Sequence, residues 1–184
     1  GMVGSDGETH QGIFDLSYLS SIPNMTVMAP KNTWELSDMM KFAVRYDGPI
    51  ALRYPRGEAY DGLSRFRLPI EYGKWETIYD ENEIALLAVG SMVKTAVEVR
   101  DRLRQMGYGC TLVNARFVKP LDQEAIRTLQ AEHQLLVTME ENVKSGGFGE
   151  AVLEYLNEIK SQTRAMVIAL PDDYVEHGNV ALLK

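Results

Sequence analysis

The sequence predicts an α/β protein of three layers (α/β/α), in which a mostly parallel sheet lies between two layers of helices. Apolar runs of strand length alternate with helical patterns through residues 74–184, an order that is typical of βαβ units. Residues 84–89 are apolar throughout, as in a strand that helices cover on both faces. The next helix is expected over residues 92–106, ending at Gly107, with the apolar stripe Met92, Ala96, Val99, Leu103 and Met106.

The other elements of this C-terminal region follow from similar patterns. Residues 74–79 and 84–89 flank the polar segment 80–83, which predicts a β-hairpin and therefore one antiparallel strand in the sheet. Asp122 is a suitable N-cap for the helix that comes after it. Further strands are expected at residues 110–117, 134–139 and 165–170, and a further helix at residues 148–159.

The N-terminal residues predict a strand, a helix and a second strand. Residues 26–29 and residues 50–54 are short apolar runs, and each is followed by a proline. Asn32 is suited to cap the helix between them, with Glu35 at the position that a capping box requires. This helix, over residues 33–46, is expected to bury the stripe Leu36, Met39, Met40, Ala43 and Val44.

The spacing of these elements divides the chain into three parts. One strand–helix–strand unit is too small to cover both faces of a sheet, so we expect residues 1–56 to be an incomplete α/β unit. Residues 57–73 contain three glycines and a proline without periodicity, and we expect a linker there. Residues 74–184 are expected to form a domain of their own, consistent with a chain of 184 residues.

Composition excludes several classes of function. The net charge of −7 argues against a nucleic-acid partner. The longest apolar run, residues 84–89, is far below the roughly 20 residues of a membrane span, and no membrane partner is expected. The single cysteine, Cys110, excludes an internal disulfide and fits a cytoplasmic, reducing environment. Acidic residues are interleaved with a basic helical cluster, which we interpret as a solvated face of Arg100, Arg102 and Arg104.

Polar residues gather near the N-terminus in a pattern that suggests a site for a small anion. Asp6 and His10 stand in a glycine-containing loop that leads into a helix, and Arg53 and Arg56 end the second strand. A histidine exchanges protons near neutral pH, and a guanidinium group binds phosphate in a bidentate manner. From residue types alone, a histidine in a loop is more often structural, and Arg56 is more simply a surface arginine.

Longer motifs favour a functional site over these structural interpretations. Residues 3–57 resemble the 1-deoxy-D-xylulose-5-phosphate synthase family of the transketolase superfamily, and residues 116–122, 138–142 and 146–149 resemble it as well. The resemblance covers nearly the whole chain, yet the family's full chain is several times longer. We therefore expect a C-terminal fragment, with Gly1 left by tag removal and Met2 an internal methionine.

The resemblance implies a reaction and roles for three residues. Enzymes of this family join pyruvate to glyceraldehyde 3-phosphate with loss of carbon dioxide, and their product supplies isoprenoid, thiamine and pyridoxal synthesis. They use thiamine diphosphate and Mg²⁺, whose binding groups are expected upstream, so no metal site is expected here and the fragment alone should be inactive. His10 and Asp6 are implied as catalytic residues near the reacting carbons, with Asp6 orienting His10 or holding a substrate hydroxyl. Arg56 is implied as the ligand of the aldehyde's phosphate.

The resemblance also implies an assembly and the nature of each domain. Residues 1–56 would be the C-terminal part of a pyrimidine-binding domain, and residues 74–184 a transketolase C-terminal-like domain. The family is dimeric, so a homo-oligomer is expected. Two alternatives stay open: a piece of another transketolase-superfamily enzyme, and a stand-alone assembly module without catalytic activity.

Several other residues are interpreted as structural. Arg53 points away from Arg56 on a strand and is expected to pair with a carboxylate. Glu140 and Glu141 are adjacent, so on a strand they face opposite sides and do not form an acid/base pair. His133 is expected to cap a helix C-terminus, and residues 146–149 to form a tight turn. No role is assigned to His177.

Overall fold

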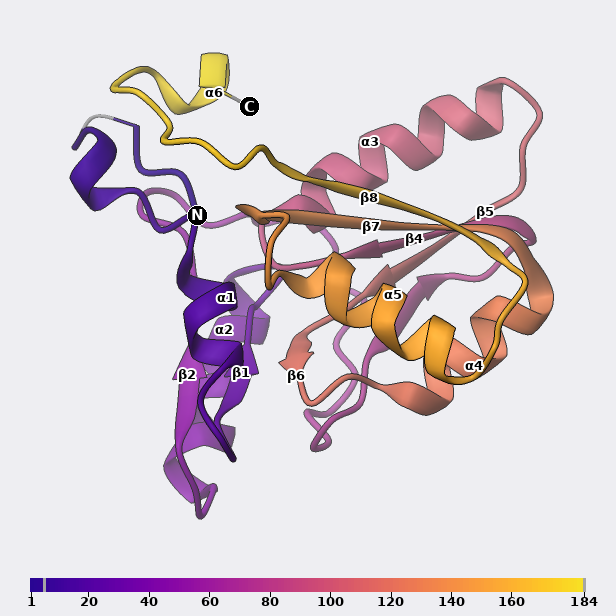
Figure 1. Cartoon of the computed structure of the whole chain (residues 1–184), viewed down its shortest axis with the longest axis horizontal. Helices are drawn as coiled ribbons and strands as arrows, with labels where there is room; N and C mark the ends of the chain where they lie inside the picture. Colours follow the sequence, from indigo (N-terminus) through magenta and orange to yellow (C-terminus); the bar gives the residue numbers. More distant parts are fainter. Residues whose placement is uncertain (5, 184) are drawn as a thin grey trace.

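The computed structural model describes residues 1–4 and 6–183, which form two β-sheets side by side (Figure 1). The larger sheet has five strands in the order β3-β5-β4-β7-β8, and only β3 is antiparallel to its neighbour. Its strands are β3 (Glu76–Tyr79), β4 (Glu83–Ala88), β5 (Cys110–Asn114), β7 (His133–Val143) and β8 (Arg164–Leu170). The mostly parallel sheet predicted from the sequence is confirmed.

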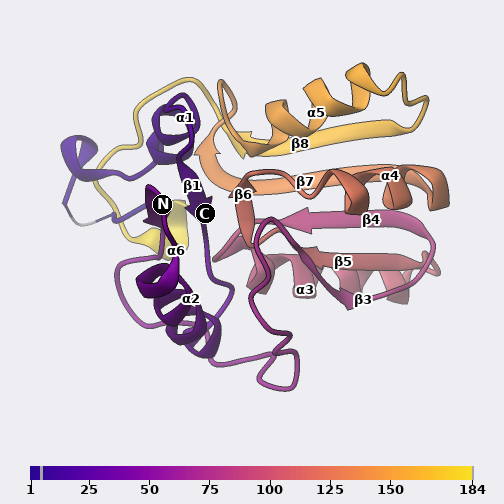
Figure 2. The same cartoon turned by 90° about the horizontal axis from the view of Figure 1, so that it is seen from below.

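Helices cover both faces of the larger sheet, which gives the three predicted layers. Helix α3 (Met92–Gln105) packs on one face, against a core formed with β4, β5 and β7. Helices α4 (Gln123–Glu132) and α5 (Phe148–Glu158) pack on the other face. Figure 1 shows α3 above and α5 below the strands, and Figure 2 shows the strands of the larger sheet side by side in the order β8, β7, β4, β5 and β3. As predicted, Asp122 caps α4, accepting a hydrogen bond from the backbone N–H of Ala125 at 3.0 Å.

The smaller sheet combines strands from the N-terminal and C-terminal regions, in the order β2-β1-β6. Strands β1 (Thr26–Met28) and β2 (Ile50–Leu52) are parallel, as expected for strands joined through helix α2 (Thr33–Arg45). Strand β6 (Phe117–Lys119) comes from the C-terminal region and pairs antiparallel with β1. Residues 74–184 therefore supply the third strand of the sheet that the N-terminal residues begin.

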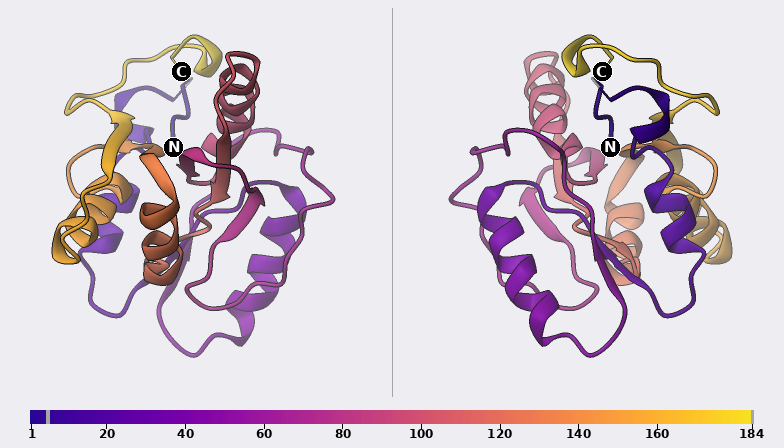
Figure 3. Two further views of the ribbon diagram at one scale, coloured as in Figure 1. Left: turned by 90° about the vertical axis from the view of Figure 1, so that its right-hand side faces the viewer. Right: turned by 90° about the vertical axis from the view of Figure 1, so that its left-hand side faces the viewer.

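The N-terminal elements share a hydrophobic core with the larger sheet. Helices α1 (Asp15–Ser20) and α2 lie on either side of the small sheet (Figure 3). Leu16 of α1 and Met39 of α2 belong to the same buried cluster as Phe148 and Val152 of α5.

The remaining helical segments are short: the 3₁₀ turn η1 (Glu8–His10) and α6 (Val180–Leu183). None of the helices in the described part is long and apolar enough to cross a bilayer.

A buried group of charged side chains connects the two sheets. The Nζ atom of Lys31, at the end of β1, lies 3.1 Å from Glu35 Oε1 of α2 and 2.6 Å from Glu76 Oε2 of β3. Asn114 of β5 donates to Glu35 Oε1 at 2.8 Å, and Arg116 Nη1 lies 3.6 Å from the same oxygen. Two cations thus balance two carboxylates in a place that excludes water.

The partners of Glu76 favour its ionised form. Burial disfavours the charged form of Glu76, but the hydrogen bonds from Lys31 and from the backbone N–H of Leu68 outweigh it and lower its pKa below the ordinary value. Glu35 also accepts a hydrogen bond from the backbone N–H of Lys31 at 2.7 Å, while Asn32 caps α2 as predicted, accepting from Glu35 N at 2.9 Å.

The predicted β-hairpin is wrong, although the antiparallel strand exists. Strand β5 lies between β3 and β4, so the two strands joined by residues 80–83 do not pair. Thr111 of β5 holds the connection, accepting from Glu81 N at 2.9 Å and donating to Glu81 O at 2.8 Å. The apolar strand β4 gains parallel partners on both edges in this way.

The predicted strand 110–117 is two strands in the structure. They are interrupted at Ala115 and Arg116, which belong to neither sheet.

Two predicted helix faces also need correction. Met40 and Val44 of α2 are exposed, at 51% and 85%, because the small sheet meets α2 along the side that carries Met39. Met106 is exposed at the end of α3. Arg100 is buried rather than solvated: its Nε donates to Cys110 O at 3.1 Å, it forms an ion pair with Glu81, and its guanidinium lies 3.8 Å from the ring centre of Tyr79.

Lys31→Met is expected to lower the free energy of unfolding by about 3–5 kcal/mol, because it leaves two buried carboxylates without their main cation. Lys41→Met is the matched control. Lys41 makes a similar ion pair on α2, with Asp38 at 3.4 Å, but its side chain is 65% exposed. The control should change stability by less than about 0.5 kcal/mol in urea unfolding. Equal effects of the two variants would contradict a stabilising role for the buried group.

Candidate functional site

A cavity of about 730 Å³ lies where the carboxyl ends of parallel strands from both sheets converge. Pro30 and Lys31 follow β1, Tyr54 to Gly57 follow β2, Ser91 follows β4, and Glu141 lies near the end of β7. Figure 2 shows β4, β7 and β8 pointing toward the N-terminal elements. The crevice outside the carboxyl ends of the strands is the usual ligand site of parallel α/β sheets.

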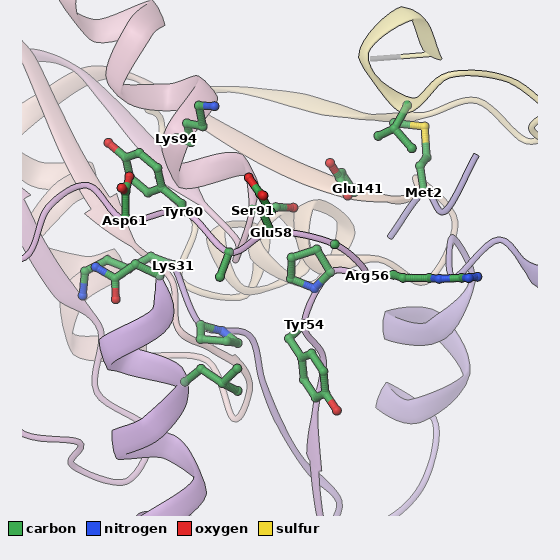
Figure 4. A pocket seen from close by; sticks show the side chains of 17 residues that line it. Met2, Lys31, Tyr54, Arg56, Glu58, Tyr60, Asp61, Ser91, Lys94 and Glu141 are labelled. Carbon is green, nitrogen blue, oxygen red and sulfur yellow. The ribbon is translucent and has the colours of Figure 1, made fainter. Parts of the chain in front are cut away.

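The cavity wall carries charges of both signs and two tyrosines (Figure 4). The cations come from three different elements, the end of β1, the end of β2 and the first turn of α3. Lys94 of α3 also lies 5.9 Å from the ring centre of Tyr60. The ionisable side chains and tyrosines that line the cavity are Lys31, Tyr54, Arg56, Glu58, Tyr60, Asp61, Lys94 and Glu141. Such a wall can hold a small polar anion through its cations and orient hydroxyl groups through its acids.

Two of the three predicted site residues are in contact. Arg56 Nη1 forms an ion pair with Asp6 Oδ2. Figure 4 shows the Arg56 side chain extending from the cavity rim toward the N-terminal segment. The arginine side chain is 66% exposed, so solvent screens the pair and an incoming anion can compete for the guanidinium. The positions of Asp6 and Arg56, fifty residues apart in the sequence, thus form one small polar site.

His10 lies on the same loop but outside the cavity wall. It ends η1, its side chain is exposed, and its Nδ1 lies 2.9 Å from Thr9 Oγ1. His10 is only four residues from Asp6 in the sequence. Its ring nevertheless lies outside the group formed by Asp6 and Arg56.

Arg53 is buried and structural, as expected, but its hydrogen-bond partners are carbonyl groups. Its Nη2 donates to Gly12 O at 3.0 Å and to Glu141 O at 2.5 Å. Burial lowers the pKa of Arg53, while the nearby carboxylates of Glu141 and Asp15 act in the opposite direction. Arg53 therefore connects β2, the loop that carries Asp6 and His10, and the end of β7.

The glycine turn before α5 binds an anion supplied by the chain itself. Glu140 accepts hydrogen bonds from the N–H groups of Phe148 at 2.9 Å and Gly149 at 2.7 Å, at the N-terminus of α5. Gly146 has φ +68°, which the turn requires. The Glu140 carboxylate thus occupies the place where a phosphate would bind, in line with the structural interpretation of residues 146–149.

His133 caps a helix, as predicted. Its Nδ1 lies 3.0 Å from Leu129 O in the last turn of α4, and its Nε2 lies 2.8 Å from Thr111 Oγ1. Cys110 is a free, buried thiol, and burial raises its pKa to about 11, which disfavours the reactive thiolate form.

Within residues 1–4 and 6–183, no three His, Cys, Asp or Glu side chains are grouped in a way that could hold a metal ion.

Sequence reasoning missed Lys31, Ser91, Lys94 and Glu141 as parts of the cavity wall. Each of these residues lies near the end of a strand, just after a strand, or in the first turn of the helix that follows a strand. This position relative to a predicted strand was the signal that the sequence offered. The order of strands in the two sheets is needed to show that these four positions face the same space.

Comparison with known proteins identifies the family. Residues 73–184 match the family model described as transketolase, C-terminal domain, and residues 1–61 match the transketolase pyrimidine binding domain. The chain belongs to the transketolase family, since the first of these matches covers more than half of it.

The similar curated relatives are 1-deoxy-D-xylulose-5-phosphate synthases, which agrees with the resemblance noted in the sequence. Identity is 55% over 185 residues with the synthase of Lachnoclostridium phytofermentans and 44% over 188 residues with that of Clostridium acetobutylicum. The synthase of Dictyoglomus turgidum is 45% identical over 185 residues. In each case the whole of this chain is covered, and it spans about 30% of the relative's length.

Solved structures show the same fold. A structure described as a split gene transketolase, inactive beta4 tetramer, has a TM-score of 0.84 and 27% identity, over 90% of this chain and 55% of that one. The transketolase of Campylobacter jejuni has a TM-score of 0.72 at 22% identity, over 96% of this chain and 26% of that one. At 22% identity, the similarity to the Campylobacter jejuni structure shows a shared fold alone.

Glu140 is expected to make stability depend on pH. Burial raises its pKa from 4.5 to about 7, more than the two backbone hydrogen bonds lower it. A carboxyl group with a higher pKa in the folded protein takes up a proton on folding between these two values. The free energy of unfolding should therefore fall as pH rises from about 4.5 to about 7, by up to about 3 kcal/mol.

Glu140→Gln should remove most of this slope when urea unfolding is compared between about pH 5 and about pH 8. Glu154→Gln, at an exposed position of the same helix α5, is the control and should keep the slope of the unsubstituted protein. A slope that survives in Glu140→Gln would mean that another group binds the proton.

Proposed function

We propose that this chain is the C-terminal part of a 1-deoxy-D-xylulose-5-phosphate synthase, which condenses pyruvate with glyceraldehyde 3-phosphate and releases carbon dioxide. The observation that carries the proposal is the contact between Arg56 and Asp6 at the rim of the cavity, in a chain 55% identical to such a synthase. A guanidinium group that already binds a carboxylate in an exposed place is suited to exchange it for the phosphate of a substrate.

Each predicted site residue has a role in this proposal. Arg56 binds the phosphate of the aldehyde, and Asp6, released from the ion pair, holds a hydroxyl group of the substrate or orients His10. His10 exchanges a proton near the reacting carbons, for which an imidazole is suited near neutral pH. His10 is exposed in this structure, so the proposal requires further parts of the enzyme to close over it.

Thiamine diphosphate is the cofactor in this proposal, and it stabilises the carbanion left by decarboxylation. Mg²⁺ accompanies the diphosphate, and both are bound by parts of the enzyme outside this chain, so the chain alone is inactive. The product serves isoprenoid, thiamine and pyridoxal synthesis. We divide the chain into the end of a pyrimidine-binding domain (residues 1–56), a linker (57–73) and a transketolase C-terminal-like domain (74–184). The buried free thiol of Cys110 suits a cytoplasmic enzyme.

Self-association belongs to the same proposal. Strands β2 and β8 form edges of their sheets in the described structure, and Met166 and Ile168 of β8 are exposed. Open edges with exposed apolar side chains favour association with another chain. The split gene transketolase, similar over 90% of this chain, is described as a tetramer. We therefore propose a homo-oligomer, a dimer in the complete enzyme.

The same comparison supports a second candidate function. The similar solved structure is described as a split gene transketolase and as inactive, which agrees with an enzyme divided between separate chains. In this alternative the chain is a separate subunit without activity of its own, and it becomes part of an enzyme only after it binds a second polypeptide.

The proposal is tested in a chimera in which this chain replaces the matching 185 residues of the Lachnoclostridium phytofermentans synthase. The chimera should form the product, whereas this chain alone, given the cofactor, Mg²⁺ and both substrates, should not. If the chimera is inactive but the chain restores activity when mixed with the upstream part of that synthase, the second candidate function is correct.

Arg56→Ala in the chimera should weaken use of glyceraldehyde 3-phosphate and spare the decarboxylation of pyruvate. The loss in kcat/KM for the aldehyde should correspond to about 2–4 kcal/mol, as for a charge-assisted contact in a closed site. Arg65→Ala, an exposed arginine in residues 57–73, is the control and should change neither step. Equal damage to both steps by Arg56→Ala would show that Arg56 supports the fold.

A further inference from the structure

Helix α1, which follows the loop of Asp6 and His10, has no N-cap of its own. Phe14 stands at the N-cap position and its side chain accepts no hydrogen bond. The N–H of Leu16 in the first turn instead donates to Asn142 Oδ1 at 3.0 Å, from a residue 126 positions later in the chain. An asparagine oxygen at this place does what an N-cap residue normally does, but it comes from strand β7.

Asn142 is the centre of a set of hydrogen bonds between this segment and the end of β7. It is fully buried, and its Nδ2 donates to Ser17 Oγ at 2.8 Å and to Val143 O at 2.8 Å. Beside it, Val143 N donates to Ile13 O at 2.8 Å. Ser17 Oγ in turn donates to Ser145 O at 2.6 Å. Residues 13–17 are therefore attached to β7 by both backbone and side chains.

The segment that follows β2 and carries Arg56 is attached to the same end of β7. Arg53 Nη2 donates to Glu141 O at 2.5 Å and to Gly12 O at 3.0 Å. The two segments that carry the proposed site residues thus meet at Glu141 and Asn142. Residues 138–142 stood out in the sequence, and neither the proposed reaction nor the cavity explains Asn142.

We propose that Asn142 is a positioning residue that holds the loop of Asp6 and His10 in place relative to Arg56. This inference rests on the proposed function. The reaction requires the groups that bind the acceptor to lie within a fraction of an ångström of their productive positions, and a displacement of about 1 Å can cost about 100-fold in rate. The larger sheet, which supplies few groups to the reaction itself, acts as the rigid support for this loop.

The first test measures hydrogen exchange in the chain itself, without cofactor. Asn142→Ala should increase amide exchange over residues 12–18 by about 10-fold or more, because local opening becomes easier there, and leave β4 unchanged. Thr138→Ala, a buried position on the same strand β7 that makes no hydrogen bond to α1 in the described structure, is the control and should leave residues 12–18 unchanged. Unchanged exchange over residues 12–18 in Asn142→Ala would overturn the inference.

The second test uses the chimera described above. Asn142→Ala should reduce kcat/KM for glyceraldehyde 3-phosphate by about 10-fold or more and leave pyruvate decarboxylation within about 2-fold, whereas Thr138→Ala should affect neither. Equal loss in both steps would show that Asn142 supports the fold only and would overturn the inference. An inactive unsubstituted chimera would instead contradict the proposed function, and the exchange measurement would then decide the role of Asn142.

Discussion

The buried ammonium group of Lys31 forms ion pairs with Glu35 of α2 and with Glu76 of β3. Glu35 lies on the helix that joins the two parallel strands of the smaller sheet, whereas Glu76 lies on a strand of the larger sheet. In the described part of the chain, no ion pair other than those with Lys31 brings a cation closer than 3.6 Å to either carboxylate. Separation of the sheets would expose the apolar core that they share and would also leave charges without partners. The relative position of the two sheets is therefore the constraint on which the cavity depends.

Two further features enforce that position. Strand β6, from the C-terminal region, completes the small sheet by pairing with β1. At the other side, Arg53 and Asn142 attach the N-terminal loop and β2 to the end of β7. As a result the carboxyl ends of β1, β2, β4 and β7 face one space, and the proposed acceptor site lies at its rim. The C-terminal region thus holds the loop of Asp6 and His10 and also adds Ser91, Lys94 and Glu141 to the cavity wall.

Local sequence patterns predicted the elements whose signals are local. Asn32 and Asp122 cap the helices that they precede, and the apolar runs form β1, β4 and β8. The pairing of β3 with β5 and the transfer of β6 to the other sheet could not be predicted, because both depend on contacts between residues far apart in the sequence. Arg100 looked solvated among charged neighbours, yet its partners Cys110 and Glu81 lie on other elements.

The candidate site was predictable only in part. Asp6, His10 and Arg56 were selected through the resemblance to a family, and the contact between Asp6 and Arg56 is visible only in the structure. Lys31 and Lys94 carry no motif, and their place in the cavity wall follows from the strand order. Asn142 was part of a recognised motif, but its bond to Leu16 joins residues 126 positions apart.

The two sheets should unfold as one cooperative unit, and the two tryptophans of the chain can test this. Trp34 lies in α2, and Trp75 packs in the shared core, donating to Phe117 O at 2.8 Å. Trp34→Phe and Trp75→Phe each leave one fluorescent reporter, whose urea unfolding curve is compared with circular dichroism of the same variant. The two curves should coincide in both variants, because the two sheets unfold together. Loss of the Trp34 signal at lower urea than the circular dichroism signal would show that the N-terminal elements unfold separately, and would contradict this expectation.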